Sequence, residues 1–431
     1  MEYPGKLARV VCSLSYWHVV AFLLLFTASI GALLRMENCG LLLTHAEVQD
    51  SQRRTRIACP VQEEPIRIVP FRAPLLDLSR EQSDLVWRVA RMHPKGKATV
   101  SDCLHFLKVQ SLRSDLRGSV AATSEVQAVC SVLQNSKSGR DYLGRPVFIT
   151  TRSGVCMTTG RRSGADESHR DQGIATLAEL GIPLSWQLNL DDGSQHFLRE
   201  AMQECIANFY LKERELAWTT VALSHYVPPT RRWTNRFGEE FTFDDLAMEL
   251  CNRSFGDQCC SGAHLVHAAT ILLRSDFEQP VLSPPTRVQL RQYVKRCADA
   301  AVRAQRPDGN WEPRWYGELE AVSPHAWSRR GTHESRFLVT SHLAEWMLYL
   351  PEDLRVPDAT LRSAAEWLLD RLSDGPFEAG SPLCPRAHAV YVLELLSTAP
   401  RFSLSTGRPG VSLRISCSAG PLRIVVDRFA V

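Results

Sequence analysis

The chain has 431 residues, of which 44% are hydrophobic and 23% charged, and its formal net charge is +3. These proportions are typical of a folded soluble protein, so extensive disorder is excluded. The sequence has no long block of Lys or Arg, and its charge therefore gives no support for nucleic-acid binding. The 13 Cys are irregularly spaced and form no Cys-x-x-Cys pair, so their spacing indicates no disulfide framework.

The N-terminal segment predicts a membrane helix. Residues 10–34 contain no charged side chain, and Lys6 and Arg9 precede them. About 20 apolar residues suffice to cross a bilayer, and basic residues on one side keep that side in the cytoplasm. We therefore expect a cytoplasmic tip and signal-anchor helix at 1–35, a linker at 36–80, and export of everything beyond. A cleaved signal peptide is the alternative, although a clear A-x-A site is missing.

From residue 81 onwards, apolar residues recur at helical intervals, and two kinds of helix alternate. One kind has a single apolar stripe, which is typical of a surface helix, whereas the other is apolar almost all round and must be buried. Counted from residue 101, the buried kind recurs about six times. The predicted helices are 81–90, 101–112, 174–180, 195–211, 213–226, 242–252, 260–273, 287–305, 337–350, 361–372 and 387–396.

This alternation predicts an all-α fold over residues 81–400. A closed ring of inner helices covered by outer ones, an (α/α)6 toroid, satisfies the requirements of both kinds of helix. A helical solenoid is the alternative, but its repeats would be more regular. A strand-like piece at 145–151 indicates a hairpin or a functional loop. The C-terminal extension, 401–431, carries two more strand-like pieces and predicts a small β-hairpin.

A His stands at the start of each of three apolar helices. These residues are His264, His342 and His388, and His105 and His169 occupy similar positions earlier in the chain. Polar residues follow each of the three at intervals of three or four, and so lie on one helical face. If these helices form an inner ring, we expect the His side chains to meet near one mouth of a shared cavity. The alternative is that polar residues collect at helix ends to satisfy unpaired N–H groups.

Cys260 and Cys384 precede His264 and His388 by four residues. Two residues four apart on a helix can hold one ion, and two Cys with two His are a common zinc set. The sequence therefore predicts a zinc site of Cys260, His264, Cys384 and His388. Two alternatives remain, a disulfide between the two Cys in an exported domain and Cys that simply pack in the core, the commonest role of a buried Cys.

Acid–base chemistry is predicted at a long polar insertion, residues 306–336. Asp308 and Glu312 lie there beside Trp311, and aromatic rings next to carboxylates suit sugar rings or cationic intermediates. An ordinary polar loop held in place by its Trp residues is the alternative. The expected catalytic residues are His264, His342, His388, Glu345, Asp308 and Glu312. The expected ligand-binding residues are Trp218, His225, Trp311, Arg386, Tyr391, His169 and Asp171.

The run from Gln305 to Trp311, Gln-Arg-Pro-Asp-Gly-Asn-Trp, resembles the Q-x3-G-x-W element of squalene and other triterpene cyclases. Related turns join the barrel helices of protein prenyltransferase β subunits, and residues 374–377 look like a degenerate copy. The resemblance covers residues 200–400 at most and implies the toroid fold rather than an activity. The acidic D-x-D-D motif of the cyclases is missing. Asp257 and Cys259 with a distant His could mimic the prenyltransferase zinc set, but those enzymes are cytosolic.

Taken together, these patterns predict a membrane-anchored, exported α/α-toroid protein. Its central cavity is expected to act on or bind a glycan or an isoprenoid-like ligand, and zinc is the expected metal. A non-catalytic interaction scaffold tethered to the membrane is the alternative. Pocket-facing carboxylates with raised pKa values would favour the enzyme.

Overall fold

In the computed structural model of the protein, the chain divides into two compact units, Met1–Ala58 and Cys59–Val431. The first unit, with the predicted N-terminal membrane helix, lies outside the described residues. Among the residues that are described, no helix is both long and apolar enough to cross a bilayer. The described residues are 61–91, 99–112, 124–151, 154–158, 171–213, 215–227, 232–320, 332–374, 383–397, 411–414 and 425–428.

The second unit is mostly helical, which confirms the predicted all-α class. Its helices are α2 (Arg80–Ala90), α3 (Val100–Ser111), α4 (Ser124–Gln134), α5 (Ser136–Leu143), α6 (Gln172–Glu179), α7 (Leu198–Ala207), α8 (Leu216–Tyr226), α9 (Phe243–Asn252), α10 (Ala263–Glu278), α11 (Pro284–Ala304), α12 (His333–Met347), α13 (Asp358–Ser373) and α14 (Leu383–Leu396). Two short 3₁₀ helices, η1 (Cys259–Gly262) and η2 (Glu352–Leu354), precede α10 and α13.

The strands form antiparallel pairs, each of two strands. The pairs are β1 (Phe148–Thr150) with β2 (Val155–Met157), β3 (Gln187–Asn189) with β4 (Gln195–Phe197), β5 (Arg232–Thr234) with β6 (Glu240–Thr242), and β7 (Val411–Arg414) with β8 (Val425–Arg428). The last pair joins Val411 to Arg428 and Arg414 to Val425, in the region where the sequence predicts a hairpin.

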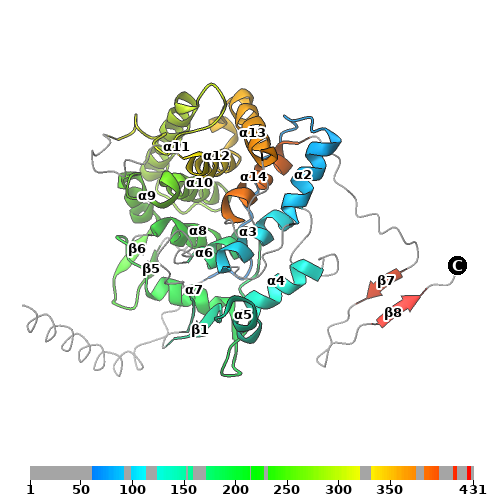
Figure 1. Ribbon diagram of the computed structural model, residues 1–431. Coiled ribbons are helices and arrows are strands. Elements are labelled where there is room, and N and C mark those ends of the chain that lie inside the picture. Colours follow the sequence, from blue (N-terminus) through cyan, green and yellow to red (C-terminus); the bar gives the residue numbers. More distant parts are fainter. Residues whose placement is uncertain are drawn as a thin grey trace, which may run out of the picture. The chain divides into compact units, whose positions relative to one another are not determined.

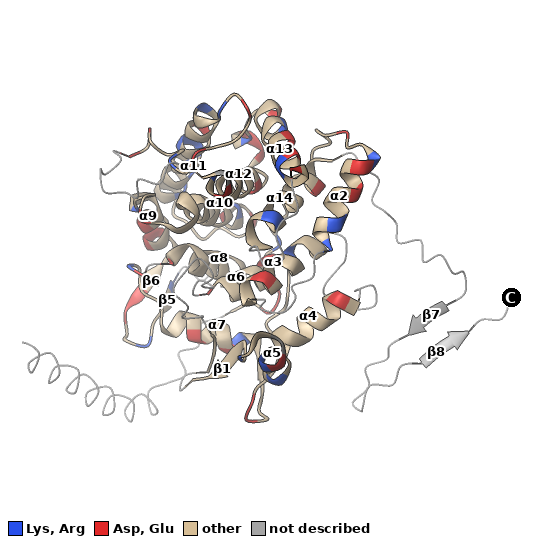
Figure 2. Cartoon of the chain, in the orientation of Figure 1, with Lys and Arg blue, Asp and Glu red and all other residues tan. Residues whose placement is uncertain are grey.

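The two kinds of helix differ in burial as the sequence predicts. All residues of α8 are buried, whereas α11 buries one side and exposes the other. The buried helices pack in succession, α3 on α6, α6 on α8, α8 on α10, α10 on α12 and α12 on α14, and α14 packs back on α3. Helices α9, α11, α13 and α2 each pack on one or two of these (Figure 1). Charged residues are frequent on the outer helices α2, α11 and α13 (Figure 2).

The Gln305–Trp311 run holds three helices together. Gln305 Nε2 donates to the carbonyls of Gly309 and of Thr360 in α13, both at 2.9 Å. Trp311 is fully buried, and its Nε1–H donates to the Ala301 carbonyl of α11 at 2.6 Å. Gly309 has a φ of +94°, and a Cβ there would lie 2.2 Å from the Ser363 carbonyl oxygen. Only glycine fits this close approach, so the motif has a structural role.

Several expected boundaries change. Residues 195–197, expected to be helical, form β4, because a turn at Gly193 (φ +79°) pairs them with β3. Cys260, expected on a helix, lies in the turn before α10. Helix α5, which directly precedes the strand-like piece 145–151, is not among the predicted helices. In the expected linker, residues 61–79 pack against the helices, and Leu76 is buried and donates its N–H to the Leu396 carbonyl at 2.9 Å.

Candidate metal centre

The buried helices bring six potential metal ligands together in two groups. His105 of α3 meets Cys384 and His388 of α14, and within this group the ligand atoms lie within 4.8 Å of one another. The ligand atoms of a second group, Cys260, His264 of α10 and His342 of α12, likewise lie within 4.8 Å of one another. We call these the first triad and the second triad. The predicted zinc set is therefore divided between them, and neither Cys is joined in a disulfide.

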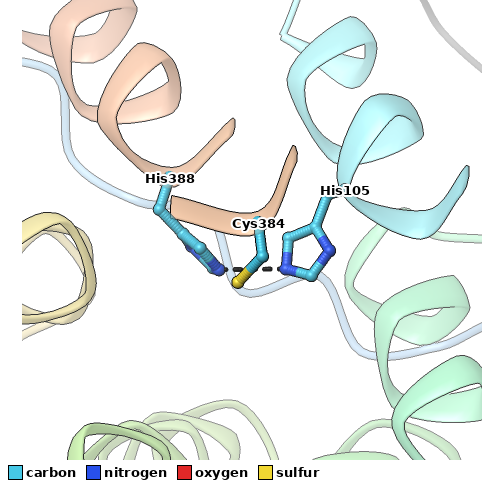
Figure 3. A group of neighbouring side chains, drawn as sticks. All are labelled: His105, Cys384 and His388. Carbon is cyan, nitrogen blue, oxygen red and sulfur yellow. Dashed lines mark hydrogen bonds between the residues drawn. The ribbon is translucent and has the colours of Figure 1, made fainter. Parts of the chain in front are cut away.

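Hydrogen bonds define the tautomers of the two His in the first triad. His105 donates from Nδ1 to the Ser101 carbonyl at 2.6 Å, one turn earlier in α3. His388 donates from Nδ1 to the Glu345 carboxylate of α12. With both Nδ1 atoms protonated, each neutral ring has only a lone pair at Nε2. Those two Nε2 atoms face each other at 3.1 Å, with the Cys384 side chain beside them (Figure 3).

Two lone pairs at this separation repel unless a positive charge lies between them. A proton on one ring or a metal ion can provide it. Burial, and then the neighbouring His388, lowers the pKa of His105 to about 3, so His105 itself remains neutral. In a tetrahedral zinc site with Zn–N bonds of about 2.05 Å, two nitrogens lie about 3.3 Å apart. The observed 3.1 Å is close to that spacing.

The second triad lies directly beside the first. The rings of His342 and His388 are 3.9 Å apart between centroids, and those of His264 and His342 are 5.2 Å apart. His342 donates from Nδ1 to the Leu338 carbonyl at 2.8 Å, so its Nε2 also carries a lone pair. That Nε2 is buried and has no hydrogen-bond partner among the described residues.

Cys260 reaches the second triad through an unusual turn. Cys260, Ser261 and Gly262 all have positive φ, at 49°, 54° and 74°. A left-handed conformation costs a non-glycine residue about 1–2 kcal/mol, so surrounding contacts must hold it. Trp315 supplies one, because its Nε1–H donates to the Ser261 carbonyl at 2.9 Å. Cys259 is directed elsewhere, and its thiol donates to Glu215 at 3.2 Å.

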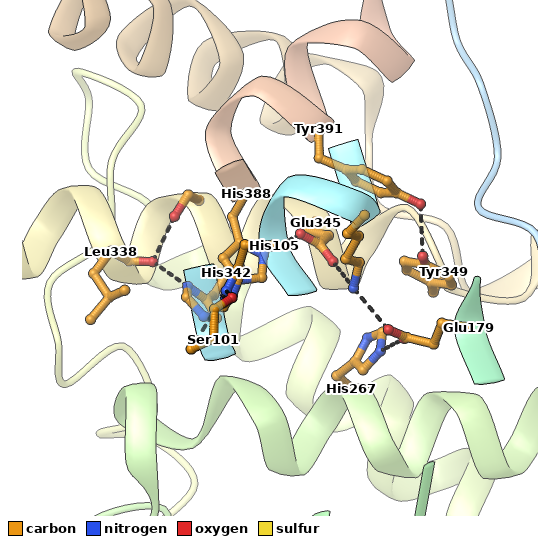
Figure 4. Close-up of polar contacts among 12 residues, drawn as sticks. Ser101, His105, Glu179, His267, Leu338, His342, Glu345, Tyr349, His388 and Tyr391 are labelled. Atoms are coloured by element: carbon orange, nitrogen blue, oxygen red, sulfur yellow. Dashed lines mark hydrogen bonds and ion pairs between the residues drawn. The ribbon is translucent and has the colours of Figure 1, made fainter. Parts of the chain in front are cut away.

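A chain of buried polar groups leads from the first triad into the helical core (Figure 4). Glu345 accepts from His388 through one carboxylate oxygen and binds Lys108 Nζ of α3 through the other, at 2.7 Å. Lys108 Nζ also lies 3.0 Å from Glu179 of α6. Glu179 in turn contacts His267 Nε2 of α10 at 2.6 Å. From His388 to His267 the chain therefore links five of the buried helices, α14, α12, α3, α6 and α10.

The carboxylates and the ammonium of this chain remain charged. Burial alone would raise the pKa of Glu345, but Lys108 and His388 hold it well below its usual range. Burial likewise raises the pKa of Glu179, yet Lys108 and His267 together lower it to about 2. Burial alone would lower the pKa of Lys108, but the two carboxylates raise it above its usual range. Two negative charges and one positive charge leave this buried group one positive charge short, unless a His or a metal ion supplies it.

A surface hollow borders the turn that carries Cys260. Its cavity volume is about 820 Å³, and Cys259 and Ser261, the neighbours of Cys260, both line it. Aromatic rings and charges of both signs line the rest of the hollow, and they include Phe255, Tyr316, Arg253, Arg314 and Asp257. Such a mixture of aromatic surface and charged groups suits a polar organic ligand.

The structure separates the expected catalytic residues into two places. Asp308 accepts from Asn310 at 2.6 Å, and Glu312 pairs with Arg306 at 3.2 Å and with Arg336 at 2.7 Å. No hydrogen bond or ion pair within the described part of the chain joins these two carboxylates to the triads. The residues that do come together are His264, His342, His388 and Glu345.

Two of the expected ligand-binding residues, Trp218 and Tyr391, lie beside the second triad and the polar chain. The Trp218 ring of α8 lies 4.7 Å from the His264 ring. The Tyr391 hydroxyl is 2.9 Å from that of Tyr349, and Lys108 Nζ lies 5.6 Å from the Tyr391 ring centroid. These rings therefore form part of the wall around the polar chain.

Other expected ligand-binding residues have contacts within the fold. His225 is buried and donates from Nδ1 to the Ile66 carbonyl at 2.6 Å, and this hydrogen bond joins the segment 61–79 to α8. Trp311 belongs to the structural turn described above. Arg386 is buried near the start of α14, where burial lowers its pKa and Asp102 opposes that change. None of these contacts requires a ligand.

Asp171 precedes α6 with a φ of 60° and accepts from the Thr219 hydroxyl at 2.7 Å. His169 lies outside the described residues. The sequence interpretation did not include Lys108 or Glu179, and it noted His105 as a His near a helix start without naming it as a site residue. A signal for Lys108 existed, since a Lys in the middle of the apolar run of α3 needs a buried partner.

No family model, curated protein or solved structure matches the chain significantly. Neither a fold family nor an activity is therefore assigned by similarity. The chemistry of the two triads and of the polar chain is what remains to indicate a function.

Proposed function

We propose that this protein is an exported, membrane-tethered metalloprotein built on an (α/α)6 toroid. In this proposal a zinc-class ion binds His105, Cys384 and His388 of the first triad. The ion serves a central site that acts on or binds a glycan or, alternatively, an isoprenoid-like ligand. The single observation that carries the proposal is the approach of the two Nε2 lone pairs to 3.1 Å beside the Cys384 thiol.

The toroid proposal is supported by the order in which the buried helices pack. Successive buried helices contact one another from α3 to α14, and α14 returns to α3. A solenoid would leave its first and last repeats apart. The Gln305–Trp311 turn, which joins α11, α12 and α13, supports the resemblance to the cyclase and prenyltransferase superfamily at the level of fold.

Zinc is favoured by the donor set and by its outer contacts. Imidazole and thiolate are the usual protein ligands of zinc, at Zn–N and Zn–S distances of about 2.0–2.1 and 2.3 Å. Metal-bound His commonly donates its other ring N–H to a carboxylate or a carbonyl, as His388 does to Glu345 and His105 to Ser101. Three protein ligands would leave a fourth position for water or a ligand, the arrangement of catalytic rather than structural zinc.

A glycan is favoured over an isoprenoid by the hollow beside the Cys260 turn. Arg253, Arg314 and Asp257 line it together with two aromatic rings, Phe255 and Tyr316. Charged groups suit hydroxyl-bearing ligands, whereas burying a purely apolar chain against them would leave them without water. The proposed membrane tether rests on the charge-free residues 10–34, and fractionation of cells with and without residues 1–35 would test it.

The alternative is a non-catalytic scaffold in which a proton, not a metal, separates the two rings. An imidazolium at His388 would satisfy both Glu345 and His105 and would also supply the missing positive charge. In that case the two triads and the polar chain only stabilise the packing of the buried helices, and they bind no ligand.

Metal analysis of the purified full chain separates the two functions. The proposal expects bound zinc in the wild-type protein and its loss from the first triad in Cys384→Ser. Cys297→Ser is the matched control, because Cys297 is a buried free Cys on α11 outside both triads. If the wild-type protein folds without metal and binds none when zinc is added, the metalloprotein proposal is refuted and the non-catalytic scaffold is supported.

A further inference from the structure

The two triads have the same composition and the same construction. Each has one Cys and two His, with the Cys four residues before one His and the second His from another helix. Cys260 and His264 are joined by His342 of α12, and Cys384 and His388 are joined by His105 of α3. We infer that the second triad holds its own zinc-class ion, so that the mouth of the inner helices carries a two-metal centre. This inference rests on the proposed metal function.

The tautomer of His342 is the first observation that carries the inference. Its Nδ1–H is committed to the Leu338 carbonyl at 2.8 Å, and its Nε2 lone pair is buried without a partner among the described residues. The side chain is only 5% exposed, so water does not readily satisfy it. An unsatisfied acceptor in such a place costs about 1–3 kcal/mol, which an ion bound to Nε2 would remove.

The number of donors is the second observation. Four imidazole nitrogens and two sulfurs exceed the four donors that a zinc ion normally takes. Within each triad the three donor atoms lie within 4.8 Å of one another, and a tetrahedral zinc site brings its donors to about 3.3–3.8 Å. Cys260, His264, Cys384 and His388 do not form such a group, so a single ion shared between them would require at least one of these side chains to move.

The contact between the triads is the third observation. His342 of one triad and His388 of the other lie ring against ring, with centroids 3.9 Å apart. Ions bound to these rings would be near neighbours, as in two-metal sites, where the ions are about 3.5–4 Å apart. The hollow is lined by Cys259 and Ser261, the neighbours of Cys260, so the second triad is the one beside it.

The test counts metal in the full chain and uses Cys259→Ser as a matched control. Cys259 is adjacent to Cys260, but its thiol contacts Glu215 instead of the triad. After reconstitution with zinc, elemental analysis should find two ions per chain in the wild type and in Cys259→Ser. It should find one ion in Cys260→Ser and one in Cys384→Ser. With cobalt in place of zinc, each of these two variants should keep about half of the thiolate-to-cobalt absorption, since each keeps one Cys–metal bond.

Other results overturn the inference in distinguishable ways. One ion in the wild type that is lost from Cys384→Ser but kept in Cys260→Ser would refute the second site and leave the proposed function standing. One ion that is lost from both variants would show a single site composed of both Cys. No ion in the wild type would refute the proposed function as well. If Cys260→Ser does not show the wild-type circular dichroism spectrum, His264→Gln replaces it with the same expected count.

Discussion

Replacing Glu345 by Gln tests whether the buried polar chain serves the first triad. Glu345 accepts from His388 Nδ1 with one oxygen and binds Lys108 with the other at 2.7 Å, and its side chain is 4% exposed. An amide keeps the shape but removes the charge from both contacts. Breaking a buried ion pair on one side costs about 3–5 kcal/mol, and loss of an outer-shell partner weakens metal binding about 10–100-fold.

We therefore expect two separate losses in Glu345→Gln. Urea unfolding should show a free energy of unfolding lower by about 3–5 kcal/mol, and competition with a chromophoric chelator should show zinc affinity lower by about 10–100-fold. Glu334→Gln is the matched control, because Glu334 is on the same helix but exposed, and it should change neither quantity. A variant that loses stability while its zinc affinity equals that of the wild type would refute the link between Glu345 and the metal.

Three further changes test the polar chain and the structural turn. Lys108→Met leaves two buried carboxylates without their cation, so the free energy of unfolding in urea titrations should fall by about 3–5 kcal/mol. The control Lys295→Met removes only an exposed ion pair, and its free energy of unfolding should fall by less than about 1 kcal/mol. Gly309→Ala introduces a Cβ that would lie 2.2 Å from a carbonyl oxygen, and thermal denaturation should show a free energy of unfolding lower by about 3 kcal/mol or more. Gly193→Ala is the control, because Gly193 also has a positive φ but open space around it, and its free energy of unfolding should fall by about 1 kcal/mol. The folded protein holds the pKa of Glu179 at about 2 instead of the usual 4.5, so ionised Glu179 contributes about 3 kcal/mol to the free energy of unfolding above pH 4.5. This contribution is lost as the pH falls towards 2. Compared with the wild type, Glu179→Gln should therefore be less stable at neutral pH and should lose less stability on acidification.

The mostly helical fold could be predicted because hydrophobic periodicity is a local signal. The apolar run of α8 and the one-sided stripe of α11 can each be identified within a single window of sequence. The β3–β4 hairpin was missed although Asp192-Gly193 is a recognised turn pair, because its strands are only three residues long. The conformation of the turn at Cys260 was missed because no rule predicts two consecutive non-glycine residues with positive φ.

The partners within the site could not be predicted, because they depend on contacts between distant segments. His105 and His388 are 283 positions apart, and although both stand in similar sequence patterns, nothing in those patterns pairs one with the other. The sequence did predict that His264, His342 and His388 would lie together, but only His264 stands at the start of its helix. His388 lies in the second turn of α14 and His342 in the second half of α12. The sequence interpretation joined the two Cys-x3-His pairs to each other, whereas the structure adds a different His to each pair.

Stability alone does not explain a Lys and two carboxylates at the centre of a helical core. Replacing a buried ion cluster by apolar side chains of similar volume is often neutral or stabilising. A role other than stability must therefore explain Lys108, Glu179 and Glu345, and the contact of this polar chain with the first triad provides one. The polar chain ends on His388 Nδ1, and an ionised acceptor there keeps the proton on Nδ1 and the lone pair on Nε2. We infer that Lys108 keeps Glu345 ionised, and that Glu345 in turn directs the His388 lone pair towards His105 and Cys384.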